Sequence, residues 1–357
     1  MKKSAIDMSS VRQNTGLWDL YTLRHEYPLM QGDGYKSYYT LPGRDSILEP
    51  VVSRYLVENK LDVTYPGDRK FAVCLTHDID IIYPTIPHRA LSSLHFLRGL
   101  DLRGLKKELF RNNSGKGQGT YINFDEIMEI EEAYGAKSSF YFMARCPGKK
   151  GSGLYDLRSI EDEIGHISDR GWEIGLHGGY YAYDDLAEIL EEKRNLESVL
   201  GKTVTGYRNH YLCFKIPDTW ELLARAGFEY DTTLGYNNMV GFRNGMCHPF
   251  KPYNLKLGRE VDIVEIPLTI MDRTLFGYAG SPARAWEQAK LLVDTVERYH
   301  GVITLLWHNT VFGSPYREEW KRLYRKILDY CSSKKAWMTS AEEISKARVA
   351  YACQNYL

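Results

Sequence analysis

Two carboxylates spaced one residue apart, Asp78 and Asp80, are the first feature of the sequence that suggests chemistry. They follow a short apolar run at residues 70–76, which predicts a buried strand. Side chains at positions i and i+2 of an extended chain point the same way, so both acids would project from one strand end. Because two close carboxylates repel each other, the pair favours a bound cation or a shared proton. A surface turn rich in acids is the alternative.

Three more ionisable residues, His177, Arg208 and His308, close other short apolar runs. A single histidine at a strand end is more often a hydrogen-bonded structural residue than a ligand or a catalyst. Here, ionisable groups stand at four predicted strand ends, where a purely structural core would carry apolar side chains. Their convergence predicts one shared site.

The elements that must position these residues alternate between strand and helix. Buried strands are predicted at residues 70–76, 137–143, 172–176, 204–208, 262–268 and 302–307. Helices are predicted from a capping box at Asn123 to Gly135, from Ser159 to near Gly171, from Asp184 to Leu200, and from the Ser-Pro pairs at 281–282 and 314–315. This alternation predicts an α/β fold with a parallel sheet, and the number of units suits a (β/α) barrel.

The loops support a barrel with its site at one end. Long segments follow the predicted strands at residues 81–122, 147–158, 235–260 and 269–280. In a (β/α) barrel the loops after the strands form the active-site face. We therefore expect the extra residues of this chain to lie around the site.

Composition excludes several classes of partner. The 357 residues include 46 Lys and Arg against 46 Asp and Glu, and this balance argues against nucleic acid and favours a glycan or a small neutral molecule. The six cysteines form no C-x-x-C pair, no apolar segment follows the first lysines as a signal peptide would require, and no apolar run is long enough to span a membrane. The expectation is a cytoplasmic protein with reduced thiols.

With these motifs in place, residues 70–340 resemble the NodB-homology polysaccharide deacetylases, carbohydrate esterase family 4. The family motif T-F-D-D is similar to residues 76–80, with one residue inserted between the acids. The motif H-x-x-x-H is matched at His177 but has Tyr181 at its second histidine. The motif R-x-P-Y is similar to residues 208–211, with His210 in place of proline. Asp231 lies in a weak match to a fourth motif, and His308 closes the apolar strand of a fifth.

The resemblance implies a fold and a domain organisation. The fold would be a distorted (β/α) barrel of the polysaccharide deacetylase type at residues 67–340. An N-terminal extension of unknown role would occupy residues 1–66, and a C-terminal helical segment residues 341–357.

The resemblance also implies roles for individual residues. The site would hold a divalent metal, most often zinc, that activates a water molecule. By analogy with the family, the metal ligands would be Asp80 and His177, and the catalytic residues Asp78 as base, Arg208 as its partner, His308 as acid, Asp231 as the group that orients His308, and Tyr211 as the backbone N–H donor to the oxyanion.

The third metal ligand is open because tyrosine is not a usual zinc ligand, and a catalytic zinc needs three protein ligands. His210 is the first candidate, since it lies two residues after Arg208 and would point the same way in an extended segment. A site with additional water is the second possibility. His77 is the third, because strand alternation turns it away from the acids.

Three residues are candidates for substrate binding: Tyr181, Arg243 in the 235–260 loop, and Trp307 beside His308. The predicted function is a hydrolase that removes an N-acetyl group from an amino sugar in a polysaccharide or a glycan precursor. The alternatives are a cyclic amide or imide hydrolase of the same fold, and a catalytically inactive barrel that binds glycan. The oligomeric state does not follow from the sequence.

Overall fold

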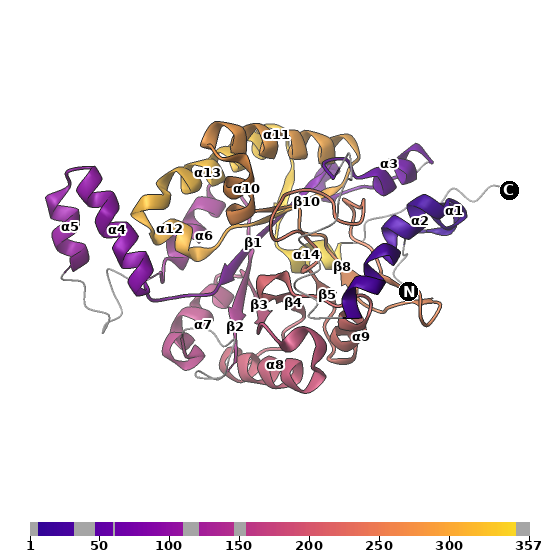
Figure 1. Cartoon of the computed structure of the whole chain (residues 1–357), viewed down its shortest axis with the longest axis horizontal. Coiled ribbons are helices and arrows are strands. Elements are labelled where there is room, and N and C mark those ends of the chain that lie inside the picture. Colours follow the sequence, from indigo (N-terminus) through magenta and orange to yellow (C-terminus); the bar gives the residue numbers. More distant parts are fainter. Residues whose placement is uncertain (1–5, 32–46, 60, 110–120, 146–154, 348–357) are drawn as a thin grey trace.

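The computed structural model describes residues 6–31, 47–59, 61–109, 121–145 and 155–347, and its centre is a parallel sheet of nine strands (Figure 1). The strands are β1 (Ala72–Ile79), β2 (Ser139–Met143), β3 (Glu173–Gly178), β4 (Gly206–Asn209), β5 (Tyr230–Asp231), β8 (Val264–Glu265), β9 (Ile270–Met271), β10 (Val302–Leu306) and β11 (Trp337–Thr339). Each of the six predicted strands overlaps an observed one. The strands β5, β9 and β11 are additional, and two of these are only two residues long.

The sheet follows the order β8-β5-β4-β3-β2-β1-β10-β9, and β11 pairs with the first residues of β1. Its two edge strands, β8 and β9, are joined by residues 266–269. Ile266 donates a backbone hydrogen bond to the β5 residue Asp231, and Thr269 donates one to the β10 residue Thr304. This short crossing brings the two edges together, so the sheet curls into a distorted (β/α) barrel, as predicted.

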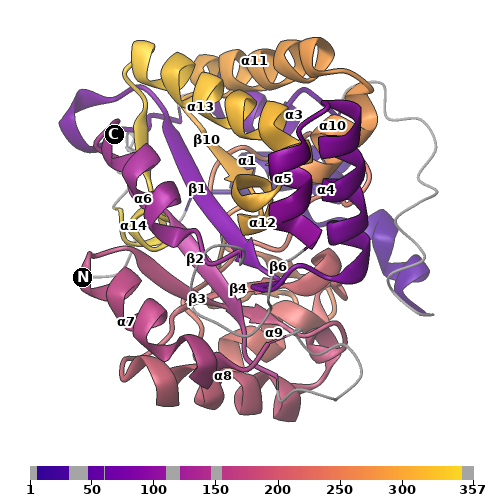
Figure 2. The same ribbon diagram turned by 90° about the vertical axis from the view of Figure 1, so that its left-hand side faces the viewer.

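Helices surround the barrel (Figures 1 and 2). Those that follow strands of the sheet are α4 (Ile86–Arg98), α5 (Leu102–Leu109), α6 (Phe124–Glu132), α7 (Glu161–Asp169), α8 (Leu186–Leu200), α9 (Asp218–Arg225), α10 (Asp272–Ala279), α11 (Pro282–Arg298), α12 (Asn309–Gly313), α13 (Glu318–Ser333) and α14 (Ala341–Lys346). In Figure 1, α11 and α13 cover one side of the sheet, and α7 and α8 cover the opposite side. None of the described helices is both long and apolar enough to cross a bilayer.

The helix boundaries agree with the predicted caps at some ends and differ at others. The α11 helix begins at Pro282 with the Ser281 side chain as its cap, and α8 ends at Gly201 in the left-handed conformation. The capping box predicted at Asn123 is wrong, because its amide instead donates to the backbone oxygen of Asn309. The cap predicted at Ser159 is also wrong, since Asp156 caps a short 3-10 turn that precedes α7.

The described part of the N-terminal extension packs on the segment between β5 and β8. It contains α1 (Ser9–Gln13), α2 (Thr15–Tyr21), the 3-10 helix η1 (Arg24–Gln31) and α3 (Val51–Glu58). Tyr21 donates a hydrogen bond to the backbone oxygen of Lys251, and the Ser53 hydroxyl accepts one from the Cys247 N–H. The segment also contains the small hairpin of β6 (Tyr253–Asn254) and β7 (Arg259–Glu260).

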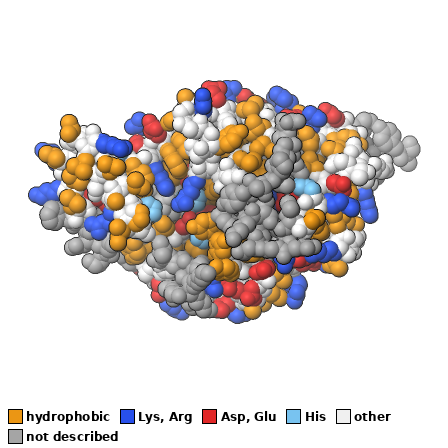
Figure 3. All heavy atoms as spheres, viewed as in Figure 1, with side chains coloured by type: hydrophobic (Ala, Val, Ile, Leu, Met, Phe, Trp, Pro, Cys, Tyr) orange, Lys and Arg blue, Asp and Glu red, His pale blue; other side chains and the backbone are white. Residues whose placement is uncertain are grey.

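On the face of the molecule drawn in Figure 3, Lys and Arg side chains are interspersed with Asp and Glu side chains, consistent with the equal numbers of basic and acidic residues in the sequence.

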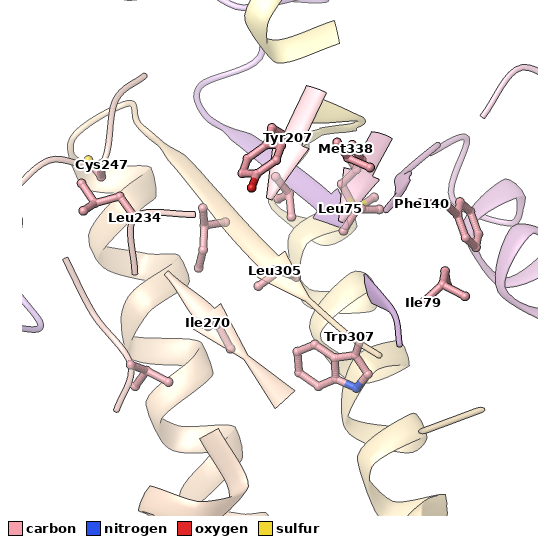
Figure 4. Packing of buried hydrophobic residues seen from close by; sticks show 14 of the residues in the cluster. Leu75, Ile79, Phe140, Tyr207, Leu234, Cys247, Ile270, Leu305, Trp307 and Met338 are labelled. Carbon is pink, nitrogen blue, oxygen red and sulfur yellow. The ribbon is translucent and has the colours of Figure 1, made fainter. Parts of the chain in front are cut away.

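The barrel strands are buried on both faces, and their alternation separates an apolar layer from a polar interior. On β1, Leu75 and Ile79 face the surrounding helices and join the main hydrophobic cluster (Figure 4). The intervening side chains of Cys74, Thr76 and Asp78 face the barrel interior, where Thr76 and Asp78 both contact Arg208. The interior is crowded: a Cβ atom on the β3 residue Gly175 would overlap the Tyr141 ring, so only glycine fits there.

Candidate metal and catalytic site

Six ionisable side chains meet at the carboxyl ends of β1, β3, β4 and β10. They are Asp78, Asp80, His177, Arg208, His210 and His308, all of them predicted from the sequence. Five belong to strand ends or lie within two residues after a strand, and His210 begins the 3-10 turn after β4. Parallel neighbouring strands end at the same edge, so the fold brings together residues that are as far as 230 positions apart in sequence.

The side chains of Asp80, His177 and His210 form a cluster that could hold a metal ion, with one ligand atom from each lying within 4.8 Å of the others. The Nε2 atom of His177 is 3.2 Å from Asp80 Oδ1, and the Nε2 atom of His210 is 3.9 Å from the same oxygen. His177 donates its Nδ1 hydrogen to the backbone oxygen of Arg208, at 3.0 Å, which leaves its Nε2 lone pair directed at the cluster.

The donor atoms of this cluster fit a divalent metal. Asp80 Oδ1, the oxygen nearest to the Nε2 atoms of His177 and His210, is buried without a hydrogen-bond partner, and an unpaired buried polar atom is costly unless something binds it. One carboxylate with two imidazoles is a common ligand set of catalytic zinc and of related first-row metals. Burial raises the pKa of Asp80, but the three surrounding histidines outweigh it and hold that pKa well below its ordinary value. The carboxylate is therefore in the form that binds a cation.

His77, the other histidine considered as a third ligand, lies outside this cluster. Its ring is fully buried on the helix-facing side of β1, where Nδ1 donates to the backbone oxygen of Trp307 at 2.7 Å. Its Nε2 is 2.8 Å from the carboxylate of Glu131, which also accepts a hydrogen bond from Tyr324. Strand alternation thus directs His77 into a hydrogen-bonded core network, as expected from the sequence.

Asp78 lies beside the cluster and is held by Arg208. Its Oδ1 atom accepts a hydrogen bond of 3.1 Å from Arg208 Nη1, and its Oδ2 atom is 3.7 Å from His177 Nε2. The guanidinium is fully buried and also donates to Thr76 and to Thr232. Burial lowers the pKa of Arg208, but the Asp78 carboxylate outweighs it and raises that pKa. This pair places one carboxylate oxygen at the metal cluster and fixes the other.

His308 adjoins the cluster at Asp80 and is held by Asp272. The His308 Nδ1 atom is 2.8 Å from Asp272 Oδ1, its backbone N–H donates to Asp272 Oδ2 at 2.9 Å, and its Nε2 atom is 3.7 Å from Asp80 Oδ2. Burial raises the pKa of Asp272, but its contacts with His308 outweigh it and lower that pKa. The imidazole therefore presents Nε2 to the cluster with a carboxylate behind it, a geometry suited to proton transfer.

The prediction that Asp231 orients His308 is wrong. Asp231 and Tyr230 are neighbours on β5, so their side chains point to opposite faces of the sheet. Tyr230 faces the interior, where its hydroxyl is 2.8 Å from that of Tyr141. Asp231 points to the outer face, where its Oδ1 atom accepts hydrogen bonds from the backbone N–H and the hydroxyl of Thr233, and burial raises its pKa to about 6. Reasoning from the sequence missed Asp272 because the predicted strand stopped at residue 268, two residues before β9 begins.

Two of the three predicted substrate-binding residues are also wrong. Trp307 is fully buried, and its indole N–H donates to the backbone oxygen of Trp320. Arg243 is equally buried and donates from Nη2 and Nε to the carboxylate of Glu26, at 2.5 and 3.3 Å. It also donates to the backbone oxygen of Gly235. Both side chains are committed to internal contacts and cannot reach a ligand.

The third predicted residue, Tyr181, belongs to an exposed group of aromatic rings next to the metal cluster. Its ring centroid is 4.7 Å from that of Tyr180, which is 5.6 Å from that of Tyr211. The Tyr211 ring is 4.4 Å from that of His210, and Tyr211 takes a left-handed φ of 59° where the chain turns after β4. Tyr181 and Tyr211 are 36% and 50% exposed, so they offer aromatic surface beside the cluster.

Comparison with known proteins finds similarity in structure but not in sequence. No protein-family model matches the chain, and no curated protein matches it either. A Mycobacterium smegmatis protein described as a polysaccharide deacetylase superimposes with a TM-score of 0.53 and 19% identity, over 80% of this chain and 92% of that one. A Pseudomonas aeruginosa protein that is also described as a polysaccharide deacetylase superimposes with a TM-score of 0.52 and 15% identity, over 79% of this chain and 92% of that one.

These superpositions identify the architecture. The chain has the polysaccharide deacetylase fold. The same comparison finds Puue allantoinase, with a TM-score of 0.53 and 17% identity over 82% of this chain and 94% of that one. Because proteins described by two different reactions share this fold, the reaction of the present chain must be argued from its site.

Proposed function

We propose that this chain is a metal-dependent hydrolase that removes the N-acetyl group from an amino sugar in a polysaccharide or a glycan precursor. The observation that carries the proposal is the arrangement around the Asp80, His177 and His210 cluster. A carboxylate, that of Asp78, adjoins His177 of the cluster, and an imidazole, that of His308, adjoins Asp80. A base and an acid that both adjoin a cation site are the groups that amide hydrolysis needs.

The metal, for which zinc is the proposed identity, would be held by Asp80, His177 and His210. When bound there, zinc would polarise an amide carbonyl and promote the ionisation of water. The rest of the chemistry falls to side chains of the chain itself. Asp78, oriented by Arg208, would accept a proton from the attacking water through the oxygen that faces the cluster.

His308 would donate a proton from Nε2 to the departing amine, because an amine leaves readily only when it is protonated. Asp272 would hold the Nδ1 hydrogen and so keep Nε2 directed at the cluster. The backbone N–H of Tyr211 is proposed to meet the negative charge that develops on the carbonyl oxygen. The rings of Tyr181 and Tyr211 would pack against the apolar faces of a sugar.

A cyclic amide or imide hydrolase is the second candidate, supported by the structural similarity to an allantoinase. An inactive glycan-binding barrel is less well supported, since binding alone has no use for a base, Asp78, and an acid, His308, that both adjoin the cluster. We also propose a reducing, cytoplasmic location, which the buried free thiols of Cys74, Cys247 and Cys331 support.

The deciding experiment measures bound metal, acetate release from N-acetylhexosamine oligomers and ring opening of allantoin or hydantoin with the same purified protein. Acetate release supports the proposal, and ring opening without it selects the second candidate. Bound metal with neither activity supports the inactive barrel. Asp78→Asn should lower kcat by at least about 100-fold while its metal content stays unchanged. The matched control Asp184→Asn, at an exposed residue outside the site, should keep full activity.

A further inference from the structure

The segment between Asp80 and β2 contains a helical hairpin that projects away from the barrel (Figures 1 and 2). Its helices, α4 and α5, pack on each other: a Cβ atom on Gly104 would overlap the Phe96 ring, and Arg89 donates to the backbone oxygen of Glu108 at 3.0 Å. The base of the hairpin is fixed by the ring of His88 against that of Tyr121, at 5.6 Å. The hairpin is thus a defined structure that is attached to the barrel at one end.

The outer surface of this hairpin is apolar. Of the twelve large hydrophobic side chains that are exposed in the described part of the chain, seven belong to it: Ile86, Leu91, Leu94, Leu97, Leu100, Leu102 and Leu109. Leu91, Leu94 and Leu97 recur every three residues along α4 and so form one stripe, and Leu102 and Leu109 lie on one side of α5. A helix of a globular domain normally buries such a stripe against the core, whereas here it faces solvent.

Basic side chains accompany the exposed leucines. Arg98, Arg103, Lys106 and Lys107 are exposed, and Asp101 is the one exposed acid among described residues 86–109. Lys106 lies between the two leucines of α5 on the helix surface, because it follows the first by four residues and precedes the second by three. In Figure 3 the lobe at the left shows this mixture of hydrophobic and basic side chains.

We propose that the α4–α5 hairpin docks on an anionic membrane surface. Exposed leucines can enter the boundary between the lipid headgroups and the acyl chains. The aliphatic parts of lysine and arginine can lie along the apolar layer while their charged groups reach the lipid phosphates. A second copy of the chain is a poorer partner, because a two-fold contact through this surface would bring its excess positive charges together. The hairpin follows the strand end that carries Asp78 and Asp80, so docking would hold the candidate site close to the bilayer.

The test measures binding of the full chain to phosphatidylcholine vesicles with and without phosphatidylglycerol, by cosedimentation at low and high salt. We expect binding only to the anionic vesicles, and weaker binding at high salt, where the charges are screened. The variants Leu94→Gln/Leu97→Gln and Lys106→Gln/Lys107→Gln should each weaken binding by at least about tenfold. The control Leu291→Gln/Arg325→Gln, which changes exposed residues on α11 and α13, should bind as the wild type does.

Three results would overturn the proposal: no binding of the wild type to anionic vesicles, equal losses in the control variant, or a wild-type dimer that Leu94→Gln/Leu97→Gln dissociates in sedimentation velocity. The last result would assign the surface to a second copy of the chain. Thermal unfolding followed by circular dichroism checks that each variant is folded. Vesicle binding needs no turnover, so it can succeed or fail independently of the proposed hydrolase activity.

Discussion

Replacing Arg243 with methionine would leave the carboxylate of Glu26 buried without its partner. Both side chains are almost completely inaccessible, at 1% and 2% exposure, and the guanidinium contacts both carboxylate oxygens. In the wild type, burial raises the pKa of Glu26, but Arg243 and His25 outweigh it and lower that pKa below the ordinary 4.5. Without Arg243, burial would dominate, and the carboxyl group would fold in its protonated form.

The size of the effect follows from that proton. Protonating a carboxyl group of ordinary pKa 4.5 at pH 7 costs about 1.36 × 2.5, or about 3.4 kcal/mol. This figure lies within the ~3–5 kcal/mol lost when one partner of a buried ion pair is removed. At pH 5 the same term falls to about 0.7 kcal/mol.

The sign of the pH dependence separates wild type from variant. In the wild type the pKa of Glu26 is lowered, so the ionised carboxylate stabilises the folded protein, and this stabilisation is fully present above pH 4.5. The contribution of Glu26 to the free energy of unfolding is therefore constant from pH 5 to pH 7. In the variant the pKa of Glu26 would be raised, so its contribution to the stability of the folded protein would be present below the ordinary pKa and would be lost as the pH rises. The destabilisation caused by Arg243→Met should therefore grow between pH 5 and pH 7.

Urea unfolding at the two pH values measures this difference. The double variant Glu26→Gln/Arg243→Met, which removes both charges, should recover most of the loss at pH 7. The control Arg259→Met breaks an exposed ion pair with Glu221 and should cost less than about 1 kcal/mol. A loss below about 1 kcal/mol for Arg243→Met, or one that is equal at both pH values, would refute the reasoning. The predicted loss would also support a stabilising role for the N-terminal extension, which we propose.

Three further predictions concern the site. Asp272→Asn should lower kcat by about 100-fold or more without loss of bound metal, since the His308 ring would lose its carboxylate partner. Asp231→Asn should leave the kcat of the folded protein within a few-fold of the wild type. Equal losses of kcat in the two variants, measured by steady-state kinetics, would contradict the assignment. His210→Ala should weaken zinc binding by at least about 100-fold in a competitive chelator titration, and unchanged affinity would remove His210 from the ligand set. Tyr181→Ala should raise the KM for oligomeric substrates at nearly constant kcat, because its ring is proposed to bind a sugar. A fall in kcat with unchanged KM would contradict this role.

Strand ends were the most predictable part of this protein. Apolar runs bounded by charge locate the main strands, and the two-residue period of a strand predicts that Asp78 and Asp80 point together while His77 points away. The same spacing argument placed His210 on the side of Arg208. These inferences are local, so they need only the period of one element and the rule that parallel strands end at a common edge.

Contacts between distant segments were decided by the tertiary structure alone. Whether Asp231 or Asp272 reaches His308 depends on which face of the two-residue strand β5 is turned inward and on α10 beginning directly after the two-residue strand β9, and no pattern in such short strands reveals it. Arg243 was a candidate for substrate binding because it lies in the long 235–260 loop, yet it pairs with Glu26, 217 positions away. The sequence by itself determined which residues could perform the chemistry, since strand period and residue type are local properties. Only the fold decided which partner each of them meets, because close packing joins side chains without regard to their separation along the chain.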